Sequence, residues 1–467
     1  MKILLISPPE GFPKKLQWVP LGLGYLGGVL KRRGYDVKLC DMCTYSWQDV
    51  KSEITKEDPD IVGISCLTLF RNQSIKVAQV AKECNPNIKI LMGGPHATFF
   101  PEHIFQLAPV DVVVLGEGEI TIIELVDALE NNRDLSNIKG IAFQLNGRIV
   151  KTQPRQLVKD LDSIPFPLYD DFDLRKYKPP ITDIPKQYRD LTTTLIITSR
   201  GCPFQCQFCS TSRFWGRFWR ARSATNVVDE LEWLYSKYDV RLLYFFDDIF
   251  TLNKRRAIEI CKELLKRKLD IVWLTETRVD CVDREMLEWM KKAGCYQIIY
   301  GVESGSPKIL KTINKGFTVD HIKRAFKLTH DAGISTIALL MVGNPGEDKT
   351  TIKETMKLMN EIKPHRTFDS IDYPGVYIGE AALTWIFPNT PLYKLAESKG
   401  IISDNYWLTD KTVPHYTGDH TLKELMFLKL RLDFGTRSKM EFVRSMVRHI
   451  NARTLFSMMS DESKSTE

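Results

Sequence analysis

Three cysteines in one short loop have the clearest chemical meaning in this chain. They are Cys202, Cys206 and Cys209, with the spacing C-x3-C-x2-C. Most iron–sulfur clusters take four cysteines, so three thiolates suit a cubic cluster that leaves one iron without a protein ligand. The alternative is a zinc knuckle, but structural zinc sites close with four ligands and no further Cys or His follows at zinc spacing. The pattern therefore predicts an iron that is open to a further molecule.

This loop resembles the signature of the radical S-adenosylmethionine (SAM) enzymes, in which the open iron chelates SAM. Phe208 stands just before the last cysteine, where an aromatic residue of that family packs by the adenine. An apolar strand is expected immediately upstream, at residues 194–198. The resemblance implies that the three cysteines hold a [4Fe-4S] cluster and that Phe208 contacts SAM.

Later motifs of the same family stand at the ends of other apolar runs. Asp247 and Asp248 match the position that holds the SAM amino group, with helix capping as the alternative for one of them. Arg278 matches the basic residue that contacts the SAM carboxylate, and Glu303 matches the acid that accepts hydrogen bonds from the ribose. Arg222 is expected to pair with a carboxylate near SAM. A surface arginine is the other interpretation of that residue.

The first 150 residues alternate short, continuously apolar runs with amphipathic stretches. This alternation predicts a parallel, doubly wound sheet with helices on both faces. A turn at Asn146-Gly147 predicts a closing hairpin. The expected strands are 2–7, 36–40, 61–65, 88–92 and 110–115, and the expected helices are 21–33, 73–83 and 119–130.

Polar and glycine-rich segments follow three of these strands, at the edge where such sheets bind ligands. Glycine also lets the backbone approach a bulky ligand closely. A radical SAM barrel preceded by such a domain is the layout of the cobalamin-dependent radical SAM enzymes, and the resemblance covers roughly residues 1–435. It implies a cobalamin-binding, Rossmann-like first domain whose contact residues are Ser65, Thr68, Gly93, Gly94, Gly116, Glu117 and Gly118.

The chain lacks the Asp-x-His-x-x-Gly motif, so the resemblance implies cobalamin without a histidine ligand on its lower face.

Two other interpretations of the first domain remain open. Gly22, Gly24 and Gly27 could indicate a nucleotide site, but they follow a proline rather than a strand. The domain could also be a scaffold without a ligand.

Cys40 and Cys43 form a C-x2-C pair without a partner pair, which favours a structural role over redox or metal chemistry.

The rest of the chain divides into three parts. Residues 151–193 are a Pro-rich connector in which regular structure is not expected. Residues 194–385 alternate strands and helices again, which fits the partial (βα)6 barrel that the resemblance implies, with its chemistry at the carboxyl ends of the strands. Residues 386–467 are expected to be helical, with a disordered tail from Ser457. The expected barrel strands are 194–198, 242–246, 271–275, 297–300, 335–342 and 382–387, and the expected helices are 226–237, 254–268, 283–293, 320–332 and 350–362.

Composition narrows the class further. No apolar run is long enough to cross a membrane, and the N-terminus is not a signal peptide, so a cytoplasmic α/β protein is expected. Ten cysteines without an export signal indicate reduced thiols. The net charge of +7 is mild for 467 residues, so nucleic acid is not expected as a partner. An acidic electron donor such as a flavodoxin or ferredoxin is the protein partner that fits.

The resemblance implies a cobalamin-dependent radical SAM enzyme that acts on a small molecule or a lipid. SAM would be cleaved at the cluster, the 5′-deoxyadenosyl radical would abstract hydrogen from an unactivated carbon, and methylcobalamin would supply a methyl group. Relatives such as the anaerobic magnesium-protoporphyrin ester cyclases form rings or oxidise instead, and the pattern does not separate these outcomes. A radical SAM enzyme without cobalamin, and a non-catalytic sensor, are further alternatives. No proton-transfer residue stands out, so the catalytic residues stay unassigned.

Overall fold

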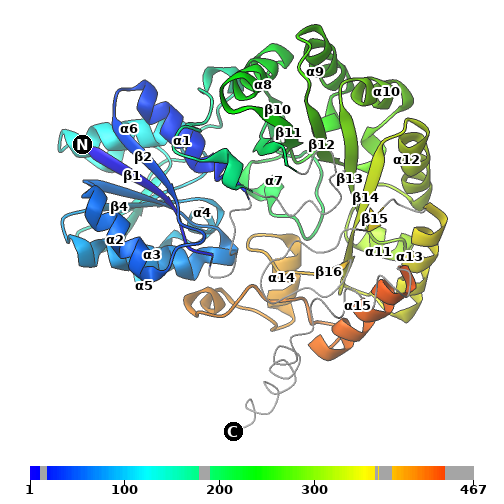
Figure 1. Ribbon diagram of the computed structural model, residues 1–467. Coiled ribbons are helices and arrows are strands. Elements are labelled where there is room, and N and C mark those ends of the chain that lie inside the picture. Colours follow the sequence, from blue (N-terminus) through cyan, green and yellow to red (C-terminus); the bar gives the residue numbers. More distant parts are fainter. Residues whose placement is uncertain (11–17, 178–189, 363–365, 368–380, 437–467) are drawn as a thin grey trace.

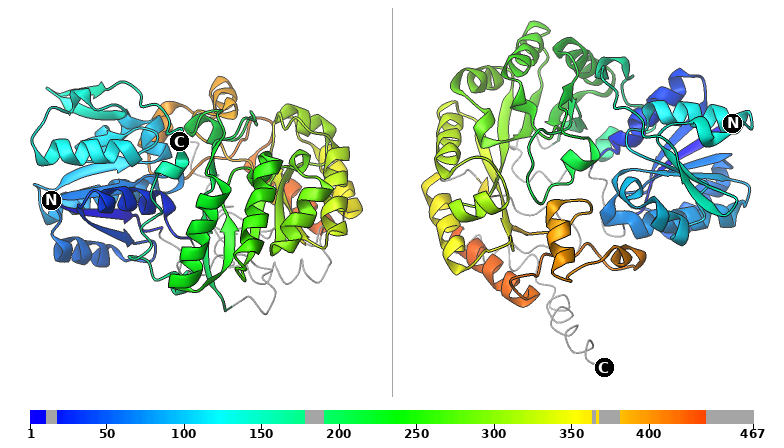
Figure 2. Two further views of the ribbon diagram at one scale, coloured as in Figure 1. Left: turned by 90° about the horizontal axis from the view of Figure 1, so that it is seen from above. Right: turned by 180° about the vertical axis from the view of Figure 1, so that it is seen from behind.

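The computed structural model describes residues 1–10, 18–177, 190–362, 366–367 and 381–436 (Figure 1). Two sheets with their helices make up most of the molecule, and a smaller helical region near the C-terminus lies against both of them (Figures 1 and 2). Among the described residues, no helix has the length and apolar character that a membrane crossing requires.

The N-terminal sheet has the strand order β2-β1-β3-β4-β5-β6-β7. Its first five strands are parallel, and β6 and β7 form an antiparallel hairpin at one edge. The expected doubly wound sheet is confirmed. The expected hairpin at Asn146-Gly147 is also confirmed, and both of these residues lie in the left-handed region, with φ of 51° and 74°. The strands are β1 (Lys2–Ser7), β2 (Asp36–Asp41), β3 (Ile61–Ser65), β4 (Lys89–Gly93), β5 (Val112–Val114), β6 (Ile141–Leu145) and β7 (Arg148–Lys151).

Six helices belong to this first unit. The three that periodicity predicts are α1, α3 and α6, while α2, α4 and α5 are additional. A capping box between Ser46 and Asp49 starts α2, and α4 and α5 are short helices that each begin with a proline. The bounds are α1 (Leu21–Arg32), α2 (Trp47–Glu57), α3 (Arg71–Cys84), α4 (Pro95–Phe99), α5 (Pro101–Leu107) and α6 (Glu119–Glu130).

The glycines of α1 form a smooth helix surface against which the connector packs. A Cβ at Gly28 would lie 2.5 Å from the carbonyl oxygen of Phe166, and one at Gly24 would lie 2.9 Å from Pro167 Cβ. The amide of Leu168 also donates to the carbonyl of Gly24 at 2.9 Å. Gly24 and Gly28 therefore serve helix–connector packing, whereas a Cβ at Gly22 would meet nothing within 4 Å. Among the described connector residues Tyr169 is fully buried; Pro179, Pro180 and Pro185 lie outside the described residues.

The second sheet is parallel throughout and has the order β15-β14-β13-β12-β11-β8. Strand β16 shares the last position, because β15 pairs with the first half of β14 and β16 with its second half. This is the expected partial barrel. Its strands are β8 (Thr192–Ile196), β11 (Val240–Phe245), β12 (Val272–Thr277), β13 (Cys295–Glu303), β14 (Ser335–Val342), β15 (Arg366–Thr367) and β16 (Ala381–Leu383).

Most of the helices line the outer side of this curved sheet, whereas α7 lies at the junction with the first unit (Figure 1). Except for α12, which comes after α11, each helix follows a strand, and some begin with a side-chain cap such as that of Ser223 on α8. Two short strands, β9 (Ser199–Arg200) and β10 (Arg220–Ala221), pair antiparallel after β8. The helices are α7 (Thr211–Phe214), α8 (Ala224–Tyr238), α9 (Lys254–Lys266), α10 (Arg284–Lys292), α11 (Pro307–Thr312), α12 (Val319–Asp331) and α13 (Lys349–Ile362).

The C-terminal region contains α14 (Pro391–Ser398), a 3-10 turn at Asp404–Leu408 and α15 (Leu422–Thr436). The segment after the turn is fastened to the first unit by Arg71 of α3. The Arg71 Nη2 atom donates to the carbonyls of Thr409, at 3.0 Å, and Lys411. Its guanidinium carbon lies 5.1 Å from the Trp407 ring centroid. The expected disordered tail from Ser457 lies outside the described residues.

We expect Arg71→Met to release this segment. The substitution leaves two carbonyls without their charged donor, and hydrogen bonds to charged groups contribute roughly 2 kcal/mol. Local opening, and with it trypsin cleavage after the exposed Lys411, should rise about 30-fold. Limited proteolysis followed by mass spectrometry measures this rate. Arg255→Met is the matched control, because Arg255 is 89% exposed and, among the described residues, forms its ion pair with Glu259 of its own helix. Equal cleavage rates in wild type and Arg71→Met would contradict the role given to Arg71.

Candidate functional site

The three cluster cysteines lie in one loop that follows β9, beyond the carboxyl end of the first barrel strand. All three thiols are free and partly exposed. The loop is held on both sides by backbone hydrogen bonds. The amide of Gln207 donates to Ile313 at 3.0 Å, and the amide of Leu392 donates to the carbonyl of Gln207 at 3.0 Å. The loop therefore has a fixed position between the barrel and the C-terminal region.

The donor set fits an iron–sulfur cluster better than a single ion. Burial raises the pKa of Cys202 to about 12, and the nearby Asp248, Cys209 and Cys206 add to the shift. Such crowding of sulfurs is what a positively charged cluster relieves. In the described part of the chain, no three Cys, His, Asp or Glu side chains are disposed to hold one metal ion. A zinc knuckle requires such a group, whereas a cubic cluster binds each thiolate to a different iron.

Gly201 is the one residue of this loop that no other amino acid can replace without moving the backbone. Its φ is +91°, and a Cβ at this position would lie 2.4 Å from the carbonyl oxygen of Phe218. The chain can therefore turn from β9 into the cysteine loop only at a glycine. Any displacement of β9 is transmitted through this tight turn to Cys202.

Asp247 and Asp248 follow β11 and take different roles. Asp247 is buried and accepts hydrogen bonds from the amides of Thr198 and Ser199, at 2.6 and 3.1 Å, and from both of their hydroxyls. It therefore fixes the turn between β8 and β9. The side chain of Asp248 is accessible to solvent. The surrounding protein and the charge of Asp247 raise its pKa to about 7. Of the two, Asp248 has the more exposed side chain.

Arg222 is buried rather than at the surface, so the surface alternative is wrong. Its Nη1 donates to Glu230 of α8, and its Nε donates to Asn226 Oδ1 at 2.6 Å. The carboxylate that it pairs with is therefore on the helix that follows. A role beside SAM stays a prediction for this residue.

Arg278, Glu303 and Phe208 are brought together around Lys315. The guanidinium of Arg278 lies 3.5 Å from the Phe204 ring centroid, and its Nη1 is 3.9 Å from Cys206 Sγ. Lys315 Nζ pairs with Glu303 at 3.1 Å and lies 5.7 Å from the Phe208 ring centroid. The predicted SAM-binding residues at the ends of β12 and β13 thus border the cysteine loop, and their individual ligand contacts stay predictions.

Four of the predicted cobalamin contacts meet at one edge of the N-terminal sheet. Ser65 pairs with Gly93 at the ends of β3 and β4, and Gly116 follows the neighbouring β5. Gly94 has φ of +104°, and a Cβ there would lie 2.9 Å from the carbonyl oxygen of Cys66. At Gly116, with φ of +76°, a Cβ would meet nothing within 4 Å. This open backbone beside tightly packed glycines is the kind of surface that a bulky planar ligand can approach.

Thr68 follows β3 in a 3-10 turn, and its side chain is buried, so its contact with a cofactor stays a prediction. His96 is also buried, between Phe100 and Trp407, with ring centroids 5.4 and 5.6 Å away. Burial, aided by the charge of Arg71, lowers the pKa of His96 to about 3. Its place under Trp407 agrees with the view that it is not a cobalt ligand.

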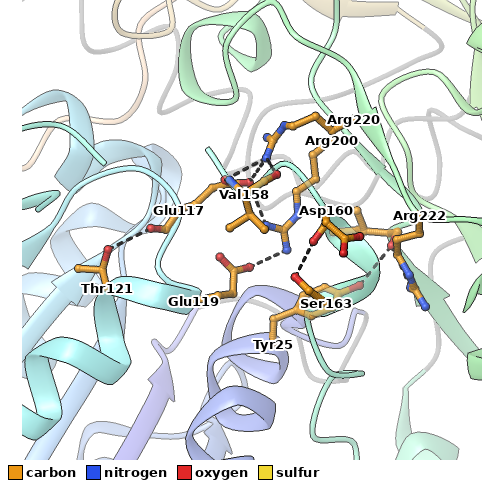
Figure 3. Close-up of polar contacts among 11 residues, drawn as sticks. Tyr25, Glu117, Glu119, Thr121, Val158, Asp160, Ser163, Arg200, Arg220 and Arg222 are labelled. Carbon is orange, nitrogen blue, oxygen red and sulfur yellow. Dashed lines mark hydrogen bonds and ion pairs between the residues drawn. The ribbon is translucent and has the colours of Figure 1, made fainter. Parts of the chain in front are cut away.

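Glu117 faces the barrel instead of the open edge (Figure 3). Its Oε1 pairs with Arg200 Nη1 at 3.0 Å and with Arg220 Nη1 at 2.9 Å. Glu119 pairs with the other arm of Arg200, at 2.6 Å. Gly118 lies between the two glutamates, where a Cβ would lie 3.0 Å from the Leu26 side chain. The structure therefore gives Glu117 an interdomain role, and its contact with a cofactor stays a prediction.

Sequence reasoning missed three residues of the site: Arg200, Arg220 and Lys315. Each is a buried or nearly buried cation whose partner is distant in sequence or on another strand. The only signal for Arg200 was its place two residues before Cys202. Glu119 stood in the same motif as Glu117 and had no separate signal.

Two known sequence families match the chain. The B12 binding domain matches residues 14–126, and the radical SAM superfamily matches residues 196–359. An uncharacterised methyltransferase of Pyrococcus horikoshii is 35% identical over 94% of this chain and 93% of its own length. The anaerobic magnesium-protoporphyrin IX monomethyl ester cyclase of Rubrivivax gelatinosus is also 35% identical, over 78% of this chain and 66% of its own.

Solved structures share the fold over most of the chain. The match to the cobalamin-dependent SAM radical enzyme OxsB, with aqua-cobalamin bound, covers 92% of this chain and 66% of the OxsB chain. Its TM-score is 0.73 and the sequence identity is 21%. The radical SAM methyltransferase TsrM from Kitasatospora setae, with cobalamin and a [4Fe-4S] cluster bound, covers 86% and 76% at a TM-score of 0.69 and 20% identity. Both sheets and their relative order are therefore known from proteins of this kind.

We expect Cys202→Ala, Cys206→Ala and Cys209→Ala each to abolish cluster assembly. Each variant removes one of the three thiolates that the predicted cluster needs. Iron and sulfide analysis after anaerobic reconstitution measures the effect, together with the visible absorption of the cluster. Cys281→Ala is the control, because Cys281 is also partly exposed but lies outside the loop. Wild-type iron content in any of the three loop variants would contradict the assignment.

Asp247→Ala should destabilise the protein, whereas Asp248→Ala should not. The first change leaves two buried amides without an acceptor, which costs about 3 kcal/mol, because each unsatisfied group costs about 1–3 kcal/mol. For a chain of 467 residues this corresponds to a fall in melting temperature of about 3 °C. Differential scanning fluorimetry of the two variants measures the difference. Equal melting temperatures would show that Asp247 does not hold the turn.

Proposed function

Since the chain belongs to the radical SAM enzymes with an N-terminal B12-binding domain, whose cofactors are a [4Fe-4S] cluster, SAM and cobalamin, we propose that it methylates an unactivated carbon of its substrate. The observation that carries the proposal is the similarity to the P. horikoshii methyltransferase over nearly the full length of both chains. The cytidylyl-2-hydroxyethylphosphonate methyltransferase of Streptomyces wedmorensis supports it, with 28% identity over 86% of each chain.

The chain's own residues support this chemistry by position. The cysteine loop follows the carboxyl end of β8, and the open glycine edge follows the carboxyl ends of β3, β4 and β5. The ion pairs from Glu117 to Arg200 and Arg220 fasten these two regions together. When bound there, the cofactors would supply a carbon-centred radical from SAM and a methyl group from cobalamin. We propose that the substrate, a small molecule or a lipid, lies between them.

A second candidate function is ring formation or oxidation without methyl transfer. It is favoured by the 35% identity to the R. gelatinosus cyclase, which equals that to the methyltransferase. This chain spans about two thirds of that cyclase's length. Both candidate functions need an external reductant, since a SAM radical forms only after one-electron reduction of the cluster. We propose a flavodoxin or ferredoxin in this role.

Product analysis separates the two candidates. Turnover of reconstituted protein with SAM, hydroxocobalamin, reductant and a substrate panel should give 5′-deoxyadenosine and S-adenosylhomocysteine in equal amounts. One SAM is consumed for the radical and one for the methyl group, so the two coproducts rise together. The organic product should gain the mass of one CH2 group, with the label of methyl-labelled SAM. Mass spectrometry measures all three quantities.

The Cys202→Ala variant is the control for adventitious SAM breakdown. Formation of 5′-deoxyadenosine with an unmethylated product and no S-adenosylhomocysteine would replace methylation by the second candidate function. Absence of both coproducts from protein with an intact cluster would contradict both functions.

A further inference from the structure

Two glutamates hold β9, the strand that leads into the cysteine loop. Glu119 lies in the first turn of α6, and Glu117 lies in the loop before it. Arg200 of β9 spans them like a fork, with Nη1 3.0 Å from Glu117 and Nη2 2.6 Å from Glu119. The side chain of Arg200 is 5% exposed, that of Glu117 is 3% exposed and that of Glu119 is 9% exposed. The rings of Tyr25 and Trp215 lie 5.2 and 5.1 Å from its guanidinium carbon. Arg200 is thus enclosed by residues from both units (Figure 3).

A second arginine joins the same cluster through the neighbouring strand. Arg220 of β10 pairs in register with Arg200 of β9. Its Nη1 atom donates to Glu117 at 2.9 Å and to the carbonyl of Val158 in the connector at 2.6 Å. The strand pair β9–β10 is therefore held by Glu117 at two points, and the connector is bound to it as well.

These contacts link the two predicted cofactor sites through very short stretches of chain. On one side, Glu117 lies between Gly116 and Gly118 at the open edge of the N-terminal sheet. On the other side, Arg200 is followed by Gly201, whose backbone is packed against Phe218, and then by Cys202. A shift of the loop at 116–119 must therefore move β9, and β9 cannot move without the first cluster cysteine.

The cluster is also a place where small shifts change energy strongly. Separating a buried ion pair leaves an uncompensated charge and is strongly unfavourable. Three further atoms, Glu119 Oε2, Arg220 Nε and Arg220 Nη2, are buried without a hydrogen-bond partner in the described residues. The pairing is therefore incomplete, and these three atoms are available for other hydrogen bonds within the cluster.

We propose that Arg200 is a positioning residue that couples cobalamin binding to retention of the iron–sulfur cluster. Occupancy of the edge at Gly116 fixes Glu117 and Glu119, these fix Arg200, and Arg200 holds the turn into Cys202. By linkage, an assembled cluster must tighten cobalamin binding by the same factor. This inference rests on the proposed function, because both cofactors must bind at the predicted sites.

The test measures how fast the reconstituted protein loses iron to a chelator, with and without saturating hydroxocobalamin. Allosteric coupling in proteins commonly spans about 5- to 150-fold, and we expect hydroxocobalamin to slow iron release about tenfold in wild type. In Arg200→Lys, which keeps the charge but loses the fork, the effect should fall below about twofold. Glu119→Gln, which removes one arm and leaves Glu117 in place, should weaken it to about threefold, and it serves if Arg200→Lys does not fold.

Glu124→Gln is the matched control. Glu124 lies on the same helix, and its ion pair with Arg155 joins α6 to the connector at the protein surface. This variant should keep the full tenfold effect. A merely structural role of Arg200 would change both iron-release rates together and leave their ratio unchanged.

The outcomes distinguish this inference from the proposed function. The reciprocal measurement compares the hydroxocobalamin affinity of wild type with that of a Cys202/Cys206/Cys209 triple alanine variant, and the wild type with its cluster should bind hydroxocobalamin more tightly. If the wild type binds hydroxocobalamin and holds its cluster, but iron release ignores hydroxocobalamin or Arg200→Lys keeps the full effect, the coupling is overturned and the proposed function stands. If hydroxocobalamin does not bind at all, both are overturned.

Discussion

The arrangement of this molecule depends on buried charge at the junction of its two sheets. An arginine 5% exposed cannot be hydrated, so it needs its carboxylates at all times. Both carboxylates that Arg200 uses come from the N-terminal unit. The N-terminal sheet therefore cannot swing away from the cysteine loop without separating four charged groups, Arg200, Arg220, Glu117 and Glu119, from their ion-pair partners. This constraint keeps the carboxyl edges of the two sheets at a set relation to each other.

A second attachment of a different kind is provided by the C-terminal region. Arg71 and the ring of His96 pack on Trp407, and Arg71 holds the carbonyls of the following segment. Figure 1 shows this segment beside the N-terminal unit. Helix α7 lies at another place along the same junction. The junction is thus fixed at two places by different interactions, one ionic and one mainly aromatic. Two separated attachments resist rotation, which a single contact does not.

How far the sequence predicts this structure depends on the range of the interactions involved. Strands β1, β3 and β14 are predicted to the residue, because continuous apolar runs bounded by turn residues mark them. The short helices α4 and α5 have no such period and were missed. For the site, the three cysteines carry their own signal. The pairing of Arg200 with Glu117 does not, because 83 residues separate them and only the folded sheets bring them together.

The two aspartates after β11 show why a motif position alone does not give a role. Asp247 lies in the short segment after β11 and Asp248 in the turn that follows, so the two adjacent residues meet different surroundings. The carboxylate of Asp247 accepts hydrogen bonds from four donors of the β8–β9 turn. The side chain of Asp248 is exposed to solvent near the cysteine loop. A pair of acids can therefore combine a structural anchor and an open carboxylate within two residues. The anchor fixes the turn between β8 and β9, which leads into the cysteine loop beside the other acid.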